Sequence, residues 1–277
     1  MDEKRPKPRA ARNPVATAPG SDFMILDKFK LDGKAALVTG ASGGLGQAMA
    51  VALAEAGADV ACHGRTAEAV GETCRMIDSL GGRGLAVAGE MSEREAPSRV
   101  VEEVATEFGK IDILINNAGT IRRTPAVDYS EQDWMDVLEV NLSSVFRLSQ
   151  AAGRKMIEQE SGKIVNIASL LSFQGGITVP AYTASKAGVA GLTKALANEW
   201  AKFNVNVNAI APGYMETKNT VALRADETRN REILERIPAG RWGEPQDVAG
   251  AAVFLSSAAS DYIHGHILVI DGGWMGR

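Results

Sequence analysis

Short apolar runs rich in β-branched residues alternate with longer amphipathic segments from Gly33 to the end of the chain. A continuous apolar run of about four to eight residues is typical of a strand that is buried on both faces, as in a parallel sheet. The alternation of such runs with helical patterns predicts a parallel sheet covered by helices. We predict seven strands, at residues 35–38, 59–62, 84–88, 113–115, 163–167, 205–209 and 267–270.

The segments between these strands carry the helical pattern. We predict helices near residues 46–56, 67–80, 93–108, 133–158, 183–202 and 247–256. No internal repeat interrupts this order, and single α/β domains commonly reach about 250 residues. The expected fold class is therefore α/β: one domain over residues 23–277, with a single doubly wound sheet of seven parallel strands and helices on both faces.

Residues 1–22 differ in composition from the rest of the chain. They are rich in Pro, Ala, Lys and Arg and show no apolar periodicity, so they cannot bury enough surface to offset the entropy of ordering. We expect a disordered N-terminal extension. Its basic run from Lys4 to Arg12 could act as a targeting arm, although a solvated leader is the simpler interpretation.

Composition and charge exclude several classes of protein. The net charge is -4 with acids and bases interspersed, so no broad basic face is available for nucleic acid. No window approaches the roughly 20 apolar residues of a membrane span, and the N-terminus lacks the apolar core of a secretory signal. The two cysteines, Cys62 and Cys74, cannot form the disulfide framework of a small secreted domain. We expect a cytoplasmic protein with no nucleic-acid or membrane partner.

A glycine-rich turn follows the first predicted strand and leads into a helix that should begin around Leu45. Gly40 can make the tight turn, Gly44 allows a pyrophosphate to approach, and Gly46 allows close packing of helix on strand, while the helix N-terminus offers free N–H groups. The spacing Gly-x-x-x-Gly-x-Gly differs from the usual Gly-x-Gly-x-x-Gly, and a plain strand-to-helix turn is the alternative. The context favours a dinucleotide site formed by Gly40, Ser42, Gly43, Gly44, Leu45 and Gly46.

The end of the second predicted strand indicates the type of cofactor. An NAD site usually has a carboxylate there, which accepts a hydrogen bond from the adenosine ribose. Here Gly64 takes that position and is followed by Arg65, whose planar cation suits a 2′-phosphate. NADP(H) is therefore favoured. NAD(H) stays open, because an arginine can also simply begin a surface helix.

Tyr182 and Lys186 lie near the start of a strongly helical stretch, and the four-residue step places both on one helix face. A phenol with a pKa near 10 is a poor base at neutral pH, but a neighbouring ammonium should lower that pKa. The pair can then exchange protons with a substrate. A Tyr-x-x-x-Lys pair alone is commonly an ordinary surface pair, so its meaning depends on the other motifs.

Together these motifs resemble the short-chain dehydrogenase/reductase family. The resemblance covers nearly everything from Leu31 to Arg277 and rests on Gly40 to Gly46, Asn116-Asn117-Ala118-Gly119, Asn141, Ser169, Tyr182-x-x-x-Lys186 and Pro212-Gly213. It implies a Rossmann-type fold and hydride transfer between a nicotinamide and a carbonyl carbon. It also implies a catalytic tetrad of Asn141, Ser169, Tyr182 and Lys186. Ser169 stands thirteen residues before Tyr182, as the family pattern requires, whereas Ser172 does not.

The resemblance further implies the role of each member of the tetrad. Tyr182 would move the proton on the substrate oxygen, Ser169 would hydrogen-bond the same oxygen, Lys186 would bind the nicotinamide ribose, and Asn141 would hold a water. Glu90 takes the place of the acidic residue that is usual after the third strand. The further cofactor contacts that the resemblance implies are Glu90, Met91, Asn117, Ala118, Gly119, Pro212, Gly213, Met215 and Thr217.

Longer strings are similar to the branch of this family that acts on sugar acids. They are Gly119 to Arg123, Ile167 to Gly176, Leu223 to Asp226 and Ile237 to Gly243. The expected activity is oxidoreduction of a secondary alcohol or ketone on a small polar substrate, a gluconate-type sugar acid. A 3-oxoacyl-thioester reductase, acting on an acyl carrier protein, is the enzymatic alternative and would need a basic patch for the carrier. A non-catalytic dinucleotide-binding regulator is the alternative of another class, and it would lack a member of the tetrad.

Candidate substrate contacts come from the loops at the carboxyl ends of the strands, where ligands of open α/β sheets bind. Arg122 and Arg123 follow the Asn116 to Gly119 turn, and an arginine fork matches a carboxylate. Gln174 and Asn219 are candidate partners for hydroxyl groups.

Two further expectations concern the end of the chain. His264 and His266 are separated by one residue and have no other ligands near them in the sequence, so we expect no required metal. The apolar last strand and the habit of the family imply a homo-oligomer, a tetramer.

Overall fold

The computed structural model describes residues 24–277, so the extension predicted at residues 1–22 lies outside the described residues. Seven parallel strands form one sheet in the order β3-β2-β1-β4-β5-β6-β7. Their bounds are β1 Ala35–Thr39, β2 Asp59–Gly64, β3 Gly84–Ala88, β4 Ile113–Asn116, β5 Gly162–Ile167, β6 Val205–Pro212 and β7 Ile267–Ile270. The predicted fold class, one doubly wound parallel sheet of seven strands, is confirmed.

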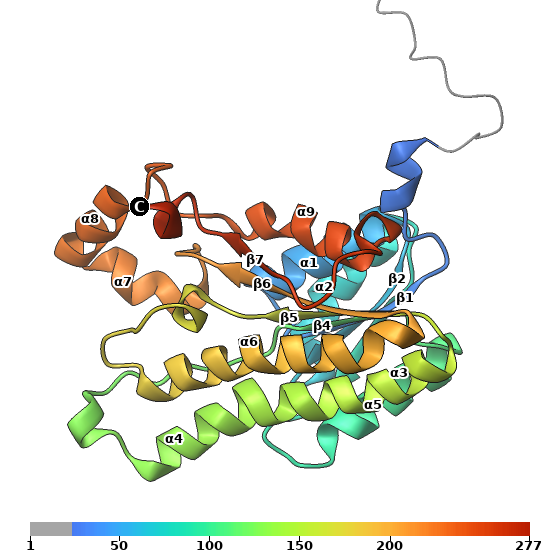
Figure 1. Ribbon diagram of the computed structural model, residues 1–277, viewed down its shortest axis with the longest axis horizontal. Helices are drawn as coiled ribbons and strands as arrows, with labels where there is room; N and C mark the ends of the chain where they lie inside the picture. The colour runs from blue at the N-terminus through green and yellow to red at the C-terminus, as the bar shows by residue number, and fades with distance from the viewer. Residues whose placement is uncertain (1–23) are drawn as a thin grey trace, which may run out of the picture.

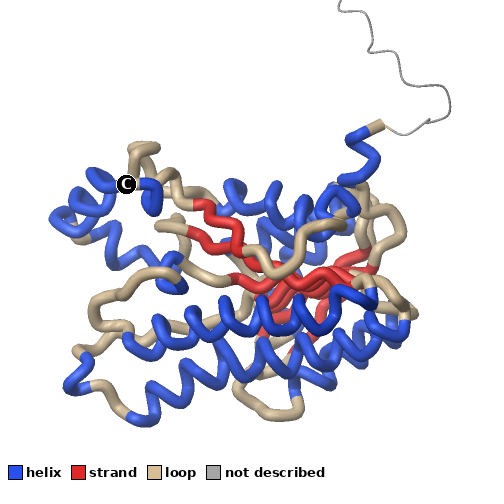
Figure 2. Tube along the Cα trace, viewed as in Figure 1, coloured by secondary structure: helices blue, strands red, loops and turns tan. Residues whose placement is uncertain are grey.

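Helices cover both faces of this sheet (Figures 1 and 2). Helices α1, α2 and α9 lie on one face, and α3, α5 and α6 lie on the other, with α4 against α6. Their bounds are α1 Gly44–Glu55, α2 Ala67–Ser79, α3 Ala96–Phe108, α4 Glu131–Leu138, α5 Ser144–Glu158, α6 Pro180–Trp200 and α9 Pro245–Ser256.

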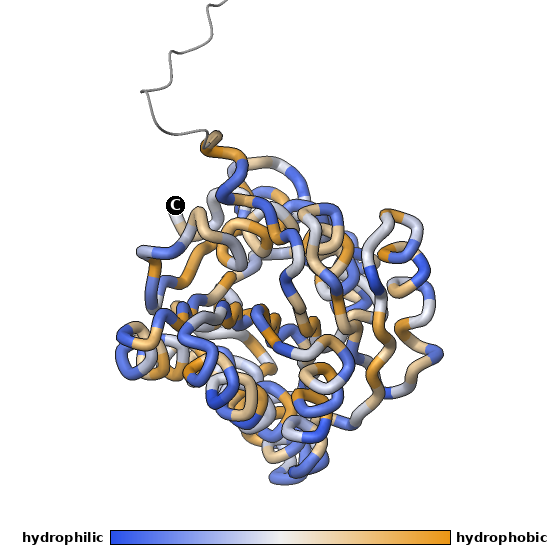
Figure 3. Tube along the Cα trace, turned by 90° about the vertical axis from the view of Figure 1, so that its right-hand side faces the viewer, coloured by the Kyte–Doolittle hydropathy of each residue, from blue (hydrophilic) through white to orange (hydrophobic). Residues whose placement is uncertain are grey.

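The core consists of two main apolar layers, one on each face of the sheet. Strand β1 is buried along its whole length and contributes to both, because successive side chains of a strand point to opposite faces. Val38 packs in the layer under α1 and α9, while Leu37 packs in the layer under α3 and α5. Along the surrounding helices apolar and polar positions alternate (Figure 3), as expected for helices with one face on the sheet. The sheet is thus a rigid base for the loops at its carboxyl edge.

The long helix predicted at 133–158 contains an irregularity. Helix α4 continues without a break into a π-helical turn, Glu139–Ser143, and from there into α5. A π-turn is rare and is frequently found at functional sites. Asn141, a predicted catalytic residue, lies in this turn and is fully buried.

Two short helices between β6 and α9 were not predicted: α7 Val221–Ala225 and α8 Glu227–Arg236. The segment is strongly polar, and Ile233 is the one residue of α8 that is buried, so the segment lacks the apolar periodicity that marks a core helix. Figure 1 shows α7, α8 and the C-terminus together at one end of the molecule. No helix within residues 24–277 has the length and apolar character of a transmembrane span.

Candidate active site

The glycine turn has the geometry that its sequence predicts. Gly40 and Gly44 adopt positive φ angles of 66° and 56°, a backbone region that other residues rarely use. A Cβ on Gly46 would lie 2.2 Å from the Gly40 carbonyl oxygen, so only glycine allows α1 to pack this closely. The helix begins at Gly44, one residue earlier than expected, and its N-cap Gly43 provides no side-chain hydrogen bond. The first-turn N–H groups are therefore available to an anion.

The second loop of the site follows β4 and is fixed to the glycine turn. The side chain of Asn117 donates to the carbonyl oxygens of Thr39 and Gly40, at 2.9 and 3.1 Å. The Thr39 hydroxyl accepts from the backbone N–H groups of Asn117 and Ala118, both at 3.0 Å. These hydrogen bonds join the Asn117 segment to the end of β1.

The segment after β6 completes this part of the site. A Cβ on Gly44 would lie 3.7 Å from the Thr217 methyl group, so Thr217 lies directly beside the glycine turn. Gly213 donates its N–H to the Ile270 carbonyl oxygen at 2.8 Å, and Pro212 and Met215 are buried. The structure thus brings together predicted cofactor residues from three loops.

Two residues at the end of β2 belong to this part of the site: Arg65, which was predicted, and His63, which was not. Arg65 is exposed, and within residues 24–277 it forms no ion pair, which leaves its guanidinium available. His63 is buried beneath the turn, with Nε2 3.0 Å from the Gly89 carbonyl oxygen and Nδ1 3.5 Å from the Gly40 nitrogen. Burial lowers the pKa of His63, so the ring is neutral at pH 7. His63 thus lies between the glycine turn and the loop after β3, and its only signal in the sequence was a histidine inside an apolar strand.

The remaining cofactor candidates lie in the loop after β3 and in the glycine turn. Met91 is buried after β3, and the Glu90 carboxylate accepts a hydrogen bond from the Ser92 N–H at 3.4 Å. Ser42 is exposed at the tip of the glycine turn, and Leu45 packs against the core.

Tyr182 and Lys186 lie one turn apart near the start of α6, as predicted. The Lys186 ammonium is 5.6 Å from the centre of the Tyr182 ring and donates to the Ile167 carbonyl oxygen. Lys186 is buried, and burial lowers the pKa of its ammonium to about 8. A lysine with this pKa changes its charge within the range of pH where enzymes commonly work.

The pKa of Tyr182 is shifted upward, opposite to the direction expected from its neighbour Lys186. Burial, the largest influence, raises the pKa of the Tyr182 phenol above 10 because the phenolate would be poorly solvated. Hydrogen bonding with Ser169 and the positive charge of Arg123 lower it, and these two effects are smaller. Tyr182 is thus a protonated donor at neutral pH.

Asn141 is held at the π-turn by hydrogen bonds on both ends of its amide. Its Oδ1 accepts from the Thr120 N–H at 2.8 Å, and its Nδ2 donates to the Thr120 carbonyl oxygen at 2.9 Å and to the Ser185 hydroxyl at 3.2 Å. The Ser185 hydroxyl donates to the Tyr182 carbonyl oxygen at 2.7 Å. The turn after Gly119, the π-turn and α6 are thereby joined. No pattern in the sequence indicated a role for Thr120 or Ser185.

The two serines of the loop after β5 have different surroundings. The Ser169 hydroxyl accepts from the Leu171 N–H at 3.2 Å, and Ser169 lies close enough to Tyr182 to lower the pKa of its phenol. The Ser172 hydroxyl donates to the Lys186 carbonyl oxygen at 2.7 Å. Ser172 therefore supports the helix, and Ser169 lies beside the phenol, in agreement with the spacing in the sequence.

The candidate substrate residues separate into two groups. Arg122 is paired with Asp133, at 3.4 Å, and donates to the Thr120 hydroxyl, so its charge is engaged away from Tyr182. Arg123 donates to the Asn219 carbonyl oxygen at 3.2 Å, and its charge acts on Tyr182. The Gln174 Oε1 accepts from the Trp274 indole N–H at 3.4 Å. Arg123 is therefore the candidate whose charge acts on the tetrad, Asn219 contacts Arg123, and Gln174 lies in the loop after β5 that also carries Ser169.

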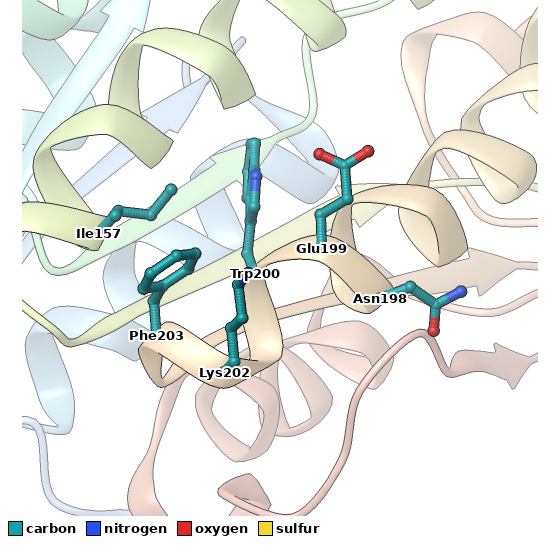
Figure 4. Close-up of a pocket in the computed structure, with 6 residues that line it drawn as sticks. All are labelled: Ile157, Asn198, Glu199, Trp200, Lys202 and Phe203. Atoms are coloured by element: carbon teal, nitrogen blue, oxygen red, sulfur yellow. The ribbon is translucent and has the colours of Figure 1, made fainter.

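Two hollows in the described residues differ in their relation to this site. The larger is about 300 Å³ and lies at the ends of α5 and α6, with apolar Ile157, Trp200 and Phe203 on one side and Asn198 and Glu199 on the other (Figure 4). It contains none of the predicted site residues. The second is about 230 Å³ and lies beside Met215, between the segment after β6 and the segment after β7.

The histidine pair near the C-terminus lies away from the tetrad. His264 Nε2 is 3.3 Å from the Asn206 side-chain nitrogen, near the start of β6 and thus at the opposite edge of the sheet. That the protein requires no metal stays a prediction.

Comparison with known proteins gives the family. A family model described as enoyl-(acyl carrier protein) reductase matches residues 40–275. A 2-dehydro-3-deoxy-D-gluconate 5-dehydrogenase of Dickeya dadantii is 56% identical over 92% of this chain and 100% of its own length. A 5-keto-D-gluconate 5-reductase of Escherichia coli is 41% identical over 90% of this chain and 98% of its own.

Solved structures agree with these relatives. A gluconate 5-dehydrogenase from Burkholderia cenocepacia, in complex with NADP and tartrate, has a TM-score of 0.88 at 38% identity, covering 92% of this chain and 100% of that one. A structure from Agrobacterium tumefaciens with bound NADP has a TM-score of 0.84 at 56% identity, covering 90% of this chain and 99% of that one. The chain belongs to the short-chain dehydrogenase/reductase family of oxidoreductases.

Proposed function

We propose that the protein is an NADP(H)-dependent oxidoreductase that interconverts a secondary alcohol and a ketone on a gluconate-type sugar acid. The observation that carries this proposal is the position of Arg123, whose cation acts on Tyr182 while Asn219 holds its guanidinium. A carboxylate bound there would lie near the Tyr182 phenol, at which we place the reacting carbonyl. The relatives named for gluconate-type substrates support the same substrate class.

The residues at the glycine turn fit the proposed cofactor. The uncapped N-terminus of α1 offers N–H groups to a pyrophosphate, and the close contact of Gly46 with Gly40 brings that terminus to the sheet edge. Arg65 supplies an available cation where a 2′-phosphate would lie. The residue directly before it is Gly64, so the carboxylate that is usual in an NAD site is absent from that position. When bound, the nicotinamide accepts or donates the hydride.

The tetrad would handle the proton. Because burial raises its pKa, Tyr182 is protonated at neutral pH and can donate to the oxygen of a ketone as that oxygen gains charge. Ser169, which lies beside Tyr182, can donate a second hydrogen bond to the same oxygen. Lys186, with a pKa of about 8, can stabilise the phenolate that remains and return a proton to it. Asn141 would fix the geometry by joining Thr120 to the start of α6.

Arg123 and Arg122 form a matched pair for the experiment. Both are exposed arginines in one loop, but only Arg123 is directed to the tetrad. Turnover is measured with hexonates, their keto and deoxy forms, uncharged ketones and an acetoacetyl thioester, with both cofactors. We expect the acids to be preferred and Arg123→Ala to raise their KM about tenfold or more, because a charge-assisted contact is lost.

The control and the contrary outcomes are defined by the same panel. Arg122→Ala should change KM little, and NADPH affinity should be unchanged in both variants. If Arg123→Ala leaves KM for the best acid unaltered, or if uncharged ketones are used equally well, the sugar-acid assignment is overturned. Preference for the thioester would instead support the 3-oxoacyl reductase. If the unmodified protein turns over none of these substrates, the result would support a non-catalytic dinucleotide-binding regulator.

The proposal includes a cytoplasmic homotetramer. Strand β7 pairs only with β6 in the described sheet and is half-buried along its length, which fits an edge that a second subunit covers. Light scattering of the purified protein tests this; a monomer at micromolar concentration would contradict it.

A further inference from the structure

The C-terminal segment folds back onto the loop that carries Ser169. Trp274 begins a short 3-10 turn, Trp274–Gly276, and is only 5% exposed. Its ring lies 4.7 Å from the Tyr214 ring and shares an apolar cluster with Leu170, the residue after Ser169. The last residues of the chain thus contact two loops of the active site.

The indole of Trp274 fixes the orientation of a side chain in that loop. Trp274 Nε1 donates to Gln174 Oε1 at 3.4 Å. An indole can only donate a hydrogen bond, so the amide oxygen of Gln174 must face it. The amide NH₂ group then points the other way, and within residues 24–277 it has no hydrogen-bond partner. Gln174 therefore presents its two N–H donors on the side away from Trp274.

The same segment holds the polar helix α8. The guanidinium of Arg236 lies 4.0 Å from the centre of the Trp274 ring, and Arg277 donates to the Glu235 carbonyl oxygen at 2.9 Å. The Ala239 N–H donates to the Gly272 carbonyl oxygen, also at 2.9 Å. Ile233 is the only buried residue of α8, so the position of this helix depends largely on its contacts with the C-terminal segment.

We propose that Trp274 is a positioning residue that sets substrate specificity through Gln174. By holding the amide oxygen, it directs the Gln174 NH₂ group to donate a hydrogen bond to an oxygen of the substrate, a carboxylate or a hydroxyl oxygen that lies beyond the reacting carbon. A sugar acid offers such acceptors along its chain, whereas the alkyl chain of an acyl thioester offers none. This inference rests on the proposed function and extends it by a second contact besides Arg123.

The test removes the indole N–H and keeps an aromatic ring. Trp274→Phe should raise KM for the best sugar acid about three- to tenfold, because the hydrogen bond from Gln174 to the substrate is weakened when Gln174 is no longer oriented. The affinity for NADPH should be unchanged. Trp242→Phe is the matched control. Trp242 is buried in the same cluster, and its indole donates to Asn230 at 2.8 Å, away from Gln174. It should leave KM unaltered.

A double-mutant cycle separates orientation from packing. Gln174→Leu should raise KM by a similar factor, and Trp274→Phe added to Gln174→Leu should raise it no further, because the group that Trp274 orients is gone. Equal effects of Trp274→Phe with and without Gln174, or equal effects of the two Trp→Phe variants, would overturn the proposal. Thermal unfolding of every variant shows whether a change in KM follows loss of structure.

The outcomes also distinguish this inference from the proposed function. If the unmodified enzyme uses sugar acids and Trp274→Phe has the same KM, the inference alone fails. If the unmodified enzyme does not use sugar acids, the proposed function fails and the inference fails with it.

Discussion

The two halves of the active site are built in different ways. On the cofactor side the structure uses backbone and small residues: Gly46 is within contact of Gly40, and one hydroxyl, that of Thr39, holds the loop after β4. On the substrate side it uses long side chains on loops. Arg123 reaches Asn219, 96 residues away, and Gln174 reaches Trp274, 100 residues away.

This difference shows which half can change without loss of the fold. The cofactor side is fixed by the sheet, because its turns follow directly from buried strands and its hydrogen bonds are to backbone atoms. The substrate side depends on single hydrogen bonds made by long side chains, each worth a modest free energy. Substitutions on the substrate side should alter which acid is used, and those on the cofactor side should alter cofactor binding or folding.

The largest expected effect is at the point where the two halves meet. Tyr182→Phe keeps the ring and removes the transferable proton, so turnover should fall at least 100-fold while NADPH affinity is kept. Steady-state kinetics and a fluorescence titration with NADPH measure the two quantities. Tyr262→Phe, at a fully exposed tyrosine, is the control and should have normal turnover. Retention of more than about a tenth of the activity would remove Tyr182 from the proton-transfer role.

A smaller effect is expected from the cation at the edge of the cofactor side. Arg65→Ala should weaken NADPH binding by roughly ten- to a hundredfold and narrow or reverse the preference over NADH, because a contact between two charged groups is lost. Dissociation constants for both cofactors measure this. Arg75→Ala, at an exposed arginine of α2, should change neither constant. Equal affinities of the unmodified enzyme for NADPH and NADH would refute the assignment to NADP.

The sequence predicted the cofactor side better than the substrate side for the same structural reason. Apolar runs located all seven strands, and the glycine spacing located the turn, because both depend on local backbone geometry. Helices α7 and α8 were missed since they bury almost nothing. The bond from Trp274 to Gln174 joins segments 100 residues apart, and no pattern in a single sequence indicates such a contact.

The electrostatics of the tetrad show a second limit. The four-residue step from Tyr182 to Lys186 correctly predicted that the two side chains lie on one helix face. It led to the wrong direction for the pKa of Tyr182, because burial depends on how α6 packs in the whole fold. Proximity in sequence predicts which charges are neighbours. The surrounding solvent, which decides the sign of the pKa shift, follows only from the tertiary structure.

Close packing on the cofactor side gives the third prediction. A Cβ at Gly46 would lie 2.2 Å from the Gly40 carbonyl oxygen and 2.5 Å from Asn117 Nδ2, so Gly46→Ala should lower the free energy of unfolding by about 1–3 kcal/mol. Urea denaturation measures this. Gly71→Ala is the matched control: it lies in α2 with open space around its Cβ position, and alanine favours a helix. If both variants are equally stable, the cofactor side is less rigid than we infer.

The smallest expected effect concerns the pH dependence of the tetrad, where the two halves meet. Burial lowers the pKa of Lys186 to about 8, so the ammonium that can return a proton to Tyr182 is present below pH 8 and is lost as the pH rises through that value. The kcat for ketone reduction should be level below pH 8 and approach a tenfold decrease per pH unit above it. In the Lys186→Arg variant the side chain keeps its charge over this pH range. Its kcat, even if it is low, should therefore not fall above pH 8. If kcat of Lys186→Arg falls in the same way above pH 8, the decrease is caused by a group other than Lys186.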